Sequence, residues 1–419
     1  MSGRPVKRPA GASAPVGREK ALIPLFITLS AFAVSANAIA PLLSTVSGET
    51  MIPAETWGGA VTLQFLSFFV ASFCGDLFRK KHGLSNRALI LAGLVLISIE
   101  LAIGPWAIRR EATLLPWIAA LGIAGGLVET FSSVEISKAG NPDSSRNICL
   151  SQAFYSIGAL ASPQLVYLFF LLGISWKCVM PTLGLFSAAV ALYFLHRGRR
   201  GPLARAEKDA AIAGRDSRDV AIGAAPDFAR SNKGFLLGIS LTMFFYVALE
   251  GLSASWIPFM FEKRLSTSPA RAALVLVLFQ SGMIGGRLFA AYLPPRHSLW
   301  PAFRVALAAT AVVSVLSASI GTAAVRIACM ALLGFAAGPI WPVMVMISRN
   351  SSGSERITSR LIGIGALGFA TGPLLGSGLH RLGADDRFFA AQAALAAATL
   401  GAAMIAFAYR GKNDAQGHS

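Results

Sequence analysis

Two carboxylates, Glu129 and Glu250, interrupt long apolar stretches of the sequence. An ionisable residue in hydrocarbon costs about 2.5–3.5 kcal/mol on insertion scales, so a carboxylate kept there is a candidate functional group. A carboxyl group in a medium of low dielectric can bind and release a proton near neutral pH. We therefore predict that both residues bind a solute and couple its movement to protons. The structural alternative is a carboxyl group that is neutral or hydrogen-bonded between helices.

Amide, phenol and indole side chains occur in the same kind of apolar stretch. Amides bind hydroxyl groups through hydrogen bonds, and the faces of Tyr and Trp pack on apolar ligand surface. We predict that these side chains join Glu129 and Glu250 in one binding site. They are Asn37, Gln64, Gln152, Tyr155, Tyr246, Gln280 and Trp341.

The elements that must position these residues are long apolar segments. Of the 419 residues, 54% are hydrophobic and only 14% are charged, whereas soluble domains carry about a quarter charged residues. The apolar segments have about the 20 residues that a helix needs to cross 30 Å of hydrocarbon. We predict twelve transmembrane helices, at 21–46, 55–78, 86–108, 113–138, 147–172, 175–196, 234–260, 270–293, 300–321, 323–347, 358–380 and 387–409.

The positive charge of the chain is distributed unevenly between the two sides of this arrangement. Most of the 37 Lys and Arg residues fall in the tails and in the even-numbered connections. Lys and Arg resist translocation and face anionic lipid, so this side is predicted to be cytoplasmic. The net charge of +17 therefore reports topology and not a nucleic-acid partner. We expect a multi-pass protein of the cell membrane, a bacterial inner membrane, with both termini in the cytoplasm.

A polar segment divides the chain into two similar halves. Residues 197–233 contain nine basic and five acidic residues, with six predicted spans on either side. Three short motifs recur across this linker in the same order and at nearly the same offset. The pairs are Gly75–Phe78 with Gly286–Phe289, Leu121–Gly126 with Leu333–Gly338, and Gly158–Pro163 with Gly368–Pro373.

With six spans per half, matched helices have the same orientation, so the halves are parallel repeats. The fold class is therefore an all-α membrane protein with two six-helix bundles. We predict a disordered tail at 1–20, bundles at 21–196 and 234–409, a linker at 197–233 and a second tail at 410–419. The repeat aligns Trp341 with Glu129, and it brings Glu250 into register with a position one turn from Asn37. The binding site is expected near the middle of the membrane, between the bundles.

The sequence contains no pattern of metal ligands or of catalytic residues. Its four cysteines and five histidines are scattered and form no ligand spacing. We expect no metal, no cofactor and no enzymatic activity, and we expect a monomer.

Several stretches resemble one transporter family. The segment Gly126–Thr130 followed by Arg146–Gly158, and the segment Phe245–Glu250 with Trp256, are similar to motifs of the major facilitator superfamily. Within it, they look most like the fucose–galactose–glucose:proton symporters. Trp341-Pro342 and the segment from Gly365 to Gly376 resemble the tenth and eleventh spans of that family.

The resemblance implies roles for several residues. It places Glu129 at the carboxylate of the fourth span, which takes part in proton coupling and substrate binding. Asn37 stands four residues before Pro41, where fucose carriers have an acidic residue. An amide cannot carry a proton, so the resemblance leaves Glu250 to take that role.

The resemblance also implies residues for gating. The Gly75-Asp76 pair followed by Arg79 is a degenerate version of the loop motif that locks one conformation in the superfamily. We assign gating to Asp76, Arg79 and the repeat-related Arg287. The expected function is secondary active transport of a sugar or similar small polar solute by alternating access, with protons as the expected coupling ion. The alternatives are an exporter of amphipathic compounds and a membrane sensor of the same fold that does not transport.

Overall fold

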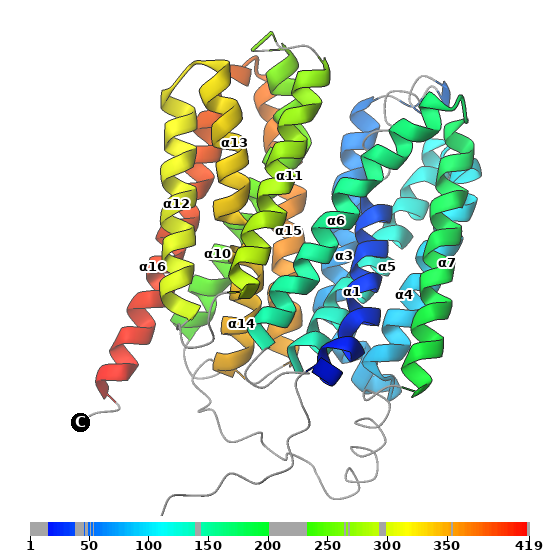
Figure 1. The fold of residues 1–419 in the computed structure, drawn as a ribbon, viewed down its shortest axis with the longest axis horizontal. Coiled ribbons are helices and arrows are strands. Elements are labelled where there is room, and N and C mark those ends of the chain that lie inside the picture. Colours follow the sequence, from blue (N-terminus) through cyan, green and yellow to red (C-terminus); the bar gives the residue numbers. More distant parts are fainter. Residues whose placement is uncertain are drawn as a thin grey trace, which may run out of the picture.

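The computed structural model forms two groups of helices that stand side by side (Figure 1). It describes residues 16–37, 46, 49–50, 52, 54–138, 144–200, 233–263, 265–266, 269–292, 299–352 and 355–416. The first group contains α1 (Val16–Ala36), α3 (Ala54–His82), α4 (Asn86–Ala107), α5 (Glu111–Lys138), α6 (Ser144–Leu171) and α7 (Trp176–Arg200).

The second group has the same number of crossings. It contains α10 (Lys233–Lys263), α11 (Pro269–Tyr292), α12 (Leu299–Ser319), α13 (Ala323–Ala337), α14 (Ile340–Ser352), α15 (Glu355–Arg381) and α16 (Phe388–Gln416). The helices α13 and α14 together make one crossing, which corresponds to the predicted span 323–347. The predicted all-α fold of twelve crossings in two six-helix bundles is confirmed.

Some predicted boundaries fall elsewhere in the structure. Helix α1 begins at Val16, inside the predicted tail, and α16 continues to Gln416. Helix α7 continues to Arg200, and α10 begins at Lys233. Residues 1–15, 38–45, 201–232 and 417–419 lie outside the described residues, and with them most of the predicted tails and linker. We call the end of the molecule where α7 ends and α10 begins the linker end.

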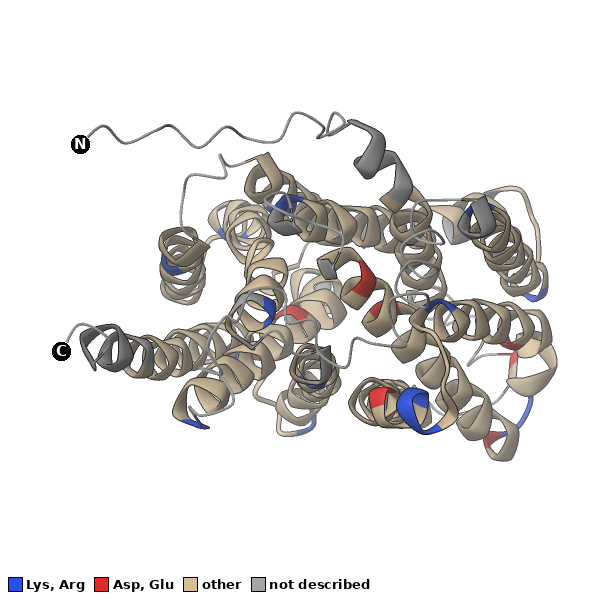
Figure 2. Ribbon diagram, turned by 90° about the horizontal axis from the view of Figure 1, so that it is seen from below, with Lys and Arg blue, Asp and Glu red and all other residues tan. Residues whose placement is uncertain are grey.

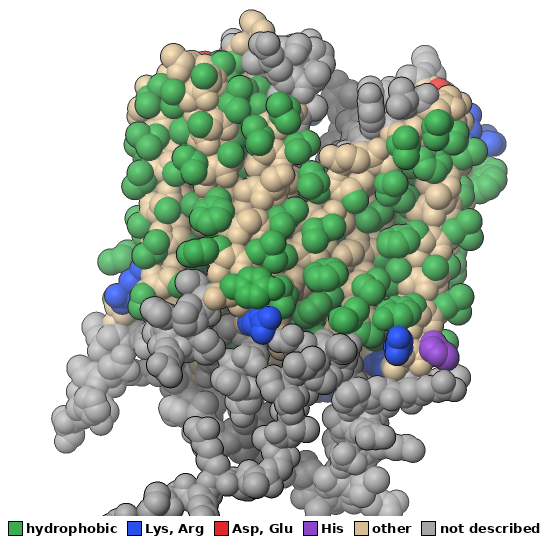
Figure 3. Space-filling model, viewed as in Figure 1, with side chains coloured by type: hydrophobic (Ala, Val, Ile, Leu, Met, Phe, Trp, Pro, Cys, Tyr) green, Lys and Arg blue, Asp and Glu red, His purple; other side chains and the backbone are tan. Residues whose placement is uncertain are grey.

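The surface around the helices is apolar. Ten of the described segments are long and apolar enough to cross a membrane. Hydrophobic side chains cover the middle of the face in Figure 3, and basic side chains lie mostly near its linker end. Seen from that end, charged positions also occur among the packed helices in the middle (Figure 2). Helices suit this environment because each pairs its backbone groups internally where no water is present.

Short connections hold neighbouring helices antiparallel. Gly83 has a φ of 63°, a left-handed conformation that glycine adopts without a Cβ clash. The amide of Leu84 then donates to the Arg79 carbonyl at 2.9 Å, and this closes α3. Ser85 begins α4, because its hydroxyl group accepts from the Ala88 amide at 3.1 Å.

Glycines bring helix backbones together at the same crossing in each half. A Cβ added at Gly122 of α5 would lie 2.1 Å from the Gln64 carbonyl of α3. A Cβ added at Gly334 of α13 would lie 2.1 Å from the Phe279 carbonyl of α11. Small residues allow this approach in lipid, where the hydrophobic effect does not drive association. The two halves therefore use one packing device at repeat-related positions.

The two halves meet through α3 with α15 and through α6 with α11 and α14. At the first contact, Arg360 lies over the ring of Phe73 at 4.8 Å. A Cβ at Gly363 would lie 3.2 Å from the Cβ of Ser72. At the second, Arg146 lies over the ring of Tyr292 at 5.1 Å. These contacts close the molecule toward its linker end, and away from it the ribbons of the halves diverge (Figure 1).

The glycine crossing predicts a position-dependent cost of one methyl group. Gly334→Ala should destabilise the protein by about 1–3 kcal/mol, because the methyl group overlaps the α11 backbone. Gly401→Ala is the matched control, since a Cβ there meets nothing within 4 Å. Thermal unfolding of the purified protein in detergent should separate the two variants. Equal unfolding temperatures would contradict the backbone contact.

Candidate functional site

A cavity of about 70 Å³ lies between the two halves. This volume holds several water molecules. Each half contributes four elements to the wall: α1, α3, α5 and α6 from the first, and α10, α11, α14 and α15 from the second. The lining residues are Phe32, Phe65, Phe68, Glu129, Gln152, Tyr155, Val247, Glu250, Arg287, Trp341, Ile362, Gly365, Ala366 and Phe369.

Glu129 is buried in the wall, with 5% of its surface exposed. Its Oε1 atom accepts a hydrogen bond from Nε2 of Gln152 at 2.9 Å. Its Oε2 atom has no hydrogen-bond partner among the described residues. Ser133 lies one turn along α5, and its hydroxyl group interacts with this carboxylate without reaching the geometry of a full hydrogen bond. Besides this contact with Ser133, the Oε2 atom keeps acceptor capacity that no hydrogen bond from the described residues uses.

Glu250 faces Arg287, the only basic residue among the described residues of the lining. Its Oε1 atom lies 3.5 Å from Nη2 of Arg287, and the two side chains are 13% and 3% exposed. The hydroxyl group of Tyr246 is buried beside both. The desolvation of two charges is offset only where they face each other and find further hydrogen bonds. Glu250 and Arg287 are thus the charged residues that the second half contributes to the described wall.

The remaining nitrogen atoms of Arg287 join the two halves. Nη1 donates to the main-chain carbonyl of Gln152 in α6 at 3.0 Å and to the hydroxyl group of Ser156. Nε donates to the Gly338 carbonyl at 3.4 Å. The guanidinium group of α11 therefore connects the first half to the break between α13 and α14.

Proline explains why the Gly338 carbonyl is available. In an uninterrupted helix, this carbonyl would accept from the amide of residue 342, but Pro342 has no N–H. Pro339 removes a further donor at the same place, and α13 ends at Ala337. A carbonyl left without a helical donor inside the protein needs another partner. Arg287 supplies it.

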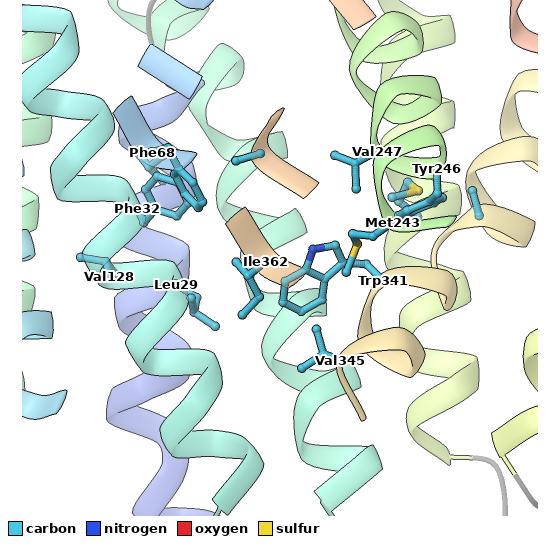
Figure 4. Packing of buried hydrophobic residues seen from close by; sticks show 14 of the residues in the cluster. Leu29, Phe32, Phe68, Val128, Met243, Tyr246, Val247, Trp341, Val345 and Ile362 are labelled. Carbon is cyan, nitrogen blue, oxygen red and sulfur yellow. The ribbon is translucent and has the colours of Figure 1, made fainter. Parts of the chain in front are cut away.

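Aromatic rings form most of the remaining wall. Phe65 of α3 and Phe369 of α15 meet across the halves, with ring centroids 4.4 Å apart. Phe32 lies 5.8 Å from both Phe68 and Tyr155. Figure 4 shows Phe32 and Phe68 side by side on the first half and Trp341 on the second, with Ile362 between them.

Five predicted binding residues line this cavity: Glu129, Gln152, Tyr155, Glu250 and Trp341. The other four lie outside its wall. Tyr246 is buried beside Glu250, and Asn37 lies beside the Tyr155 hydroxyl group and donates to the Ala33 carbonyl at 2.8 Å.

Gln64 and Gln280 lie near the glycine crossings. The main-chain carbonyl of Gln64 faces Gly122 of α5. Gln280 follows Phe279, whose carbonyl faces Gly334 of α13.

The residues predicted for gating occupy two places. Asp76 forms ion pairs with Arg79 at 2.8 Å and with Lys80 at 3.2 Å, near the linker end of α3. Arg287 instead lies in the cavity wall. Arg287 occupies the position in α11 that corresponds to Asp76 in α3. Its side chain is longer, and its guanidinium group therefore reaches α6.

The phenylalanines of the wall are not among the binding residues predicted from the sequence. Those residues all carry polar groups, and phenylalanine is frequent in the chain. A signal was available in Phe65 and Phe68, which are three residues apart and hence on one face of α3. No group of three or more His, Cys, Asp or Glu residues in the described ranges is placed to hold a metal ion.

Comparison with known proteins identifies the family. A sequence model of the Major Facilitator Superfamily matches residues 25–361, and the chain belongs to this family. Members of this family are transporters, and its fold is that of a multi-pass membrane protein. A search of curated protein sequences finds no significant match.

Solved structures share the fold at low sequence identity. The human organic anion transporter MFSD10 (TETRAN) has a TM-score of 0.69 at 16% identity, over 93% of this chain and 100% of that chain. The E. coli fucose:proton symporter FucP has a TM-score of 0.68 at 15% identity, over 93% of this chain and 99% of that one. The proton:xylose symporter XylE has a TM-score of 0.73 at 13% identity, over 94% and 95% of the two chains.

The ion pair of Glu250 with Arg287 predicts strong coupling between their substitutions. Arg287→Gln leaves a mostly buried carboxylate without its partner, and breaking such a pair costs about 3–5 kcal/mol. The double variant Arg287→Gln with Glu250→Gln should recover much of this loss, because it removes the unpaired charge. Unfolding of the four proteins of this cycle at pH 8 measures the coupling. Additive effects would contradict the pairing.

Proposed function

We propose that the chain is a proton-coupled secondary transporter that moves a small organic solute by alternating access. The observation that carries this proposal is the charge of the cavity between the halves. Two carboxylates, Glu129 and Glu250, face one guanidinium group. Full ionisation would leave one uncompensated negative charge in a place of low dielectric, which is costly. A proton or a positively charged solute balances it, and exchange between these states couples transport to a gradient.

The arrangement of the two halves supports the transport cycle. Their side-chain contacts lie mainly toward the linker end, which the distribution of Lys and Arg assigns to the cytoplasm. The structure then corresponds to a state closed on the cytoplasmic side. Rocking of the bundles about the central cavity would exchange these contacts for others at the opposite end. Arg287 belongs to both the cavity and the closing contact, and therefore links occupancy of the site to closure.

Two classes of solute have support. A sugar is suggested by the fold shared with fucose:proton and proton:xylose symporters. An amphipathic compound is favoured by the wall itself, because ten of its fourteen lining residues are aromatic, aliphatic or glycine. Both classes fit a proton-coupled carrier.

Neutralising the carboxylates should uncouple transport. Proteoliposomes are loaded with pyranine, which reports the internal pH, and a proton gradient is imposed. Uptake of radiolabelled L-fucose, D-xylose, D-glucose and tetraphenylphosphonium is then measured. The wild type should accumulate at least one of these solutes, and Glu129→Gln and Glu250→Gln should lose accumulation. Glu100→Gln, a buried carboxylate of α4 outside the cavity, is the matched control.

Full accumulation in both cavity variants would contradict the coupling role. Binding of a solute without any flux in the wild type would instead favour a sensor of the same fold.

A disulfide across the closing contact should stop the cycle. The Cβ atoms of a Ser72→Cys, Gly363→Cys double variant would lie 3.2 Å apart, close to the 3.5–4.5 Å of natural disulfides. In a background without the four native cysteines, oxidation should abolish flux, and a reducing agent should restore it. Each single variant controls for the substitution itself. Undiminished flux in fully crosslinked protein would rule out rocking at this contact.

A further inference from the structure

We infer that the solute is a monovalent organic cation with an apolar body, whose charged group binds Glu129 in the aromatic cavity. The inference rests on the proposed function and names its substrate class. Three features of the described residues support it. The guanidinium nitrogen atoms of Arg287 are all engaged by the protein, the Oε2 atom of Glu129 has no hydrogen bond, and aromatic rings form much of the wall.

The basic group is already engaged by the protein. All three guanidinium nitrogen atoms of Arg287 have protein partners: Glu250, the carbonyl groups of Gln152 and Gly338, and the hydroxyl group of Ser156. An anionic solute would have to displace Glu250 or break the link between the halves. It would also add a negative charge to a cavity that already has an excess of carboxylate. The site therefore disfavours anions.

The carboxylate of Glu129 offers what a cation needs. Gln152 orients it through Oε1 and leaves Oε2 buried and without a partner in the described structure. Hydrogen bonds between charged partners are about twice as strong as neutral ones. A bound ammonium group would use this acceptor and would also bring the charge of the cavity to zero. A proton at Glu129 would do the same, so proton and solute compete for one group.

The aromatic wall suits the rest of such a solute. Rings from both halves line the cavity, and those of Phe65 and Phe369, from opposite halves, have centroids 4.4 Å apart. Aromatic faces attract cations through the ring quadrupole, most strongly where water is excluded. They also bury apolar surface. One cationic group on an apolar body matches both features of the wall.

Other solutes fit less well. A sugar presents many hydroxyl groups that all need partners when they are buried. Besides Arg287, the lining offers Glu129, Glu250, Gln152, Tyr155 and Trp341, and four of these already bond within the protein. An inorganic cation needs about six oxygen ligands at short distance, whereas no cluster of three or more acidic, Cys or His side chains in the described ranges could hold one.

A matched set of three compounds tests the inference by binding alone. The compounds are 2-phenylethylamine, 2-phenylethanol and phenylacetate, which share a ring and a short chain but carry a positive, zero or negative charge. L-fucose represents the sugars. The thermal unfolding of the purified full-length protein is followed at pH 8 with each compound, since a ligand that binds only the folded state raises its stability.

The amine should raise the unfolding temperature by several degrees, and the alcohol and the acid should have little effect. Glu129→Gln should weaken binding of the amine by at least about 30-fold, as expected for removal of one partner of a buried charge pair. Glu100→Gln should bind like the wild type. Calorimetric titration supplies the affinities.

Every other outcome overturns the substrate class. A shift with L-fucose or phenylacetate but not with the amine would do so, as would equal binding of the amine to wild type and Glu129→Gln. No shift with any of the compounds would also count against it. Because the readout is binding, these results are independent of the flux measurements that test the proposed function.

Discussion

The structure depends on how one positive charge is accommodated in an apolar interior. The guanidinium group of Arg287 is nearly inaccessible to water, so its donors must be satisfied by the protein. Glu250 supplies the opposite charge, Gln152 and Ser156 supply acceptors from the other half, and Gly338 supplies a carbonyl that Pro342 has left free. The break between α13 and α14 is therefore part of the electrostatics of the site.

The contacts within and between the halves differ in kind. Within each half, glycines such as Gly122 and Gly334 let helix backbones touch. Between the halves, α15 also approaches α3 closely at Gly363, but side chains make the polar and cation–π contacts, with arginines over rings at Phe73 and Tyr292 and with the guanidinium of Arg287 on α6. Backbone contacts cannot be exchanged without changing the packing, whereas side-chain contacts can be released one by one. This difference suits two stiff bodies that move against each other.

The family does not decide what such a protein carries. Solved structures of the same fold are named for an organic anion, for fucose and for xylose, at 13–16% identity to this chain. The fold supplies a cavity between two bundles, and the side chains in its wall set the chemistry. Here Glu250 pairs with Arg287, whereas Glu129 accepts a hydrogen bond from Gln152 through one oxygen and has no hydrogen bond at the other among the described residues. That difference comes from the local partners of each carboxylate.

The sequence alone determined the all-α membrane fold and its twelve crossings in two halves, because lipid demands long apolar helices and a duplicated chain keeps its motifs at one offset. It also pointed to Glu129 and Glu250, since charge in hydrocarbon is rare. Only the tertiary structure decided which polar residues share a cavity. Gln64 and Gln152 have the same chemistry, yet only Gln152 lies in the wall. The facing direction of a side chain, and the pairing of Arg287 with a carbonyl freed by Pro342, depend on how helices pack, and no single helix encodes that.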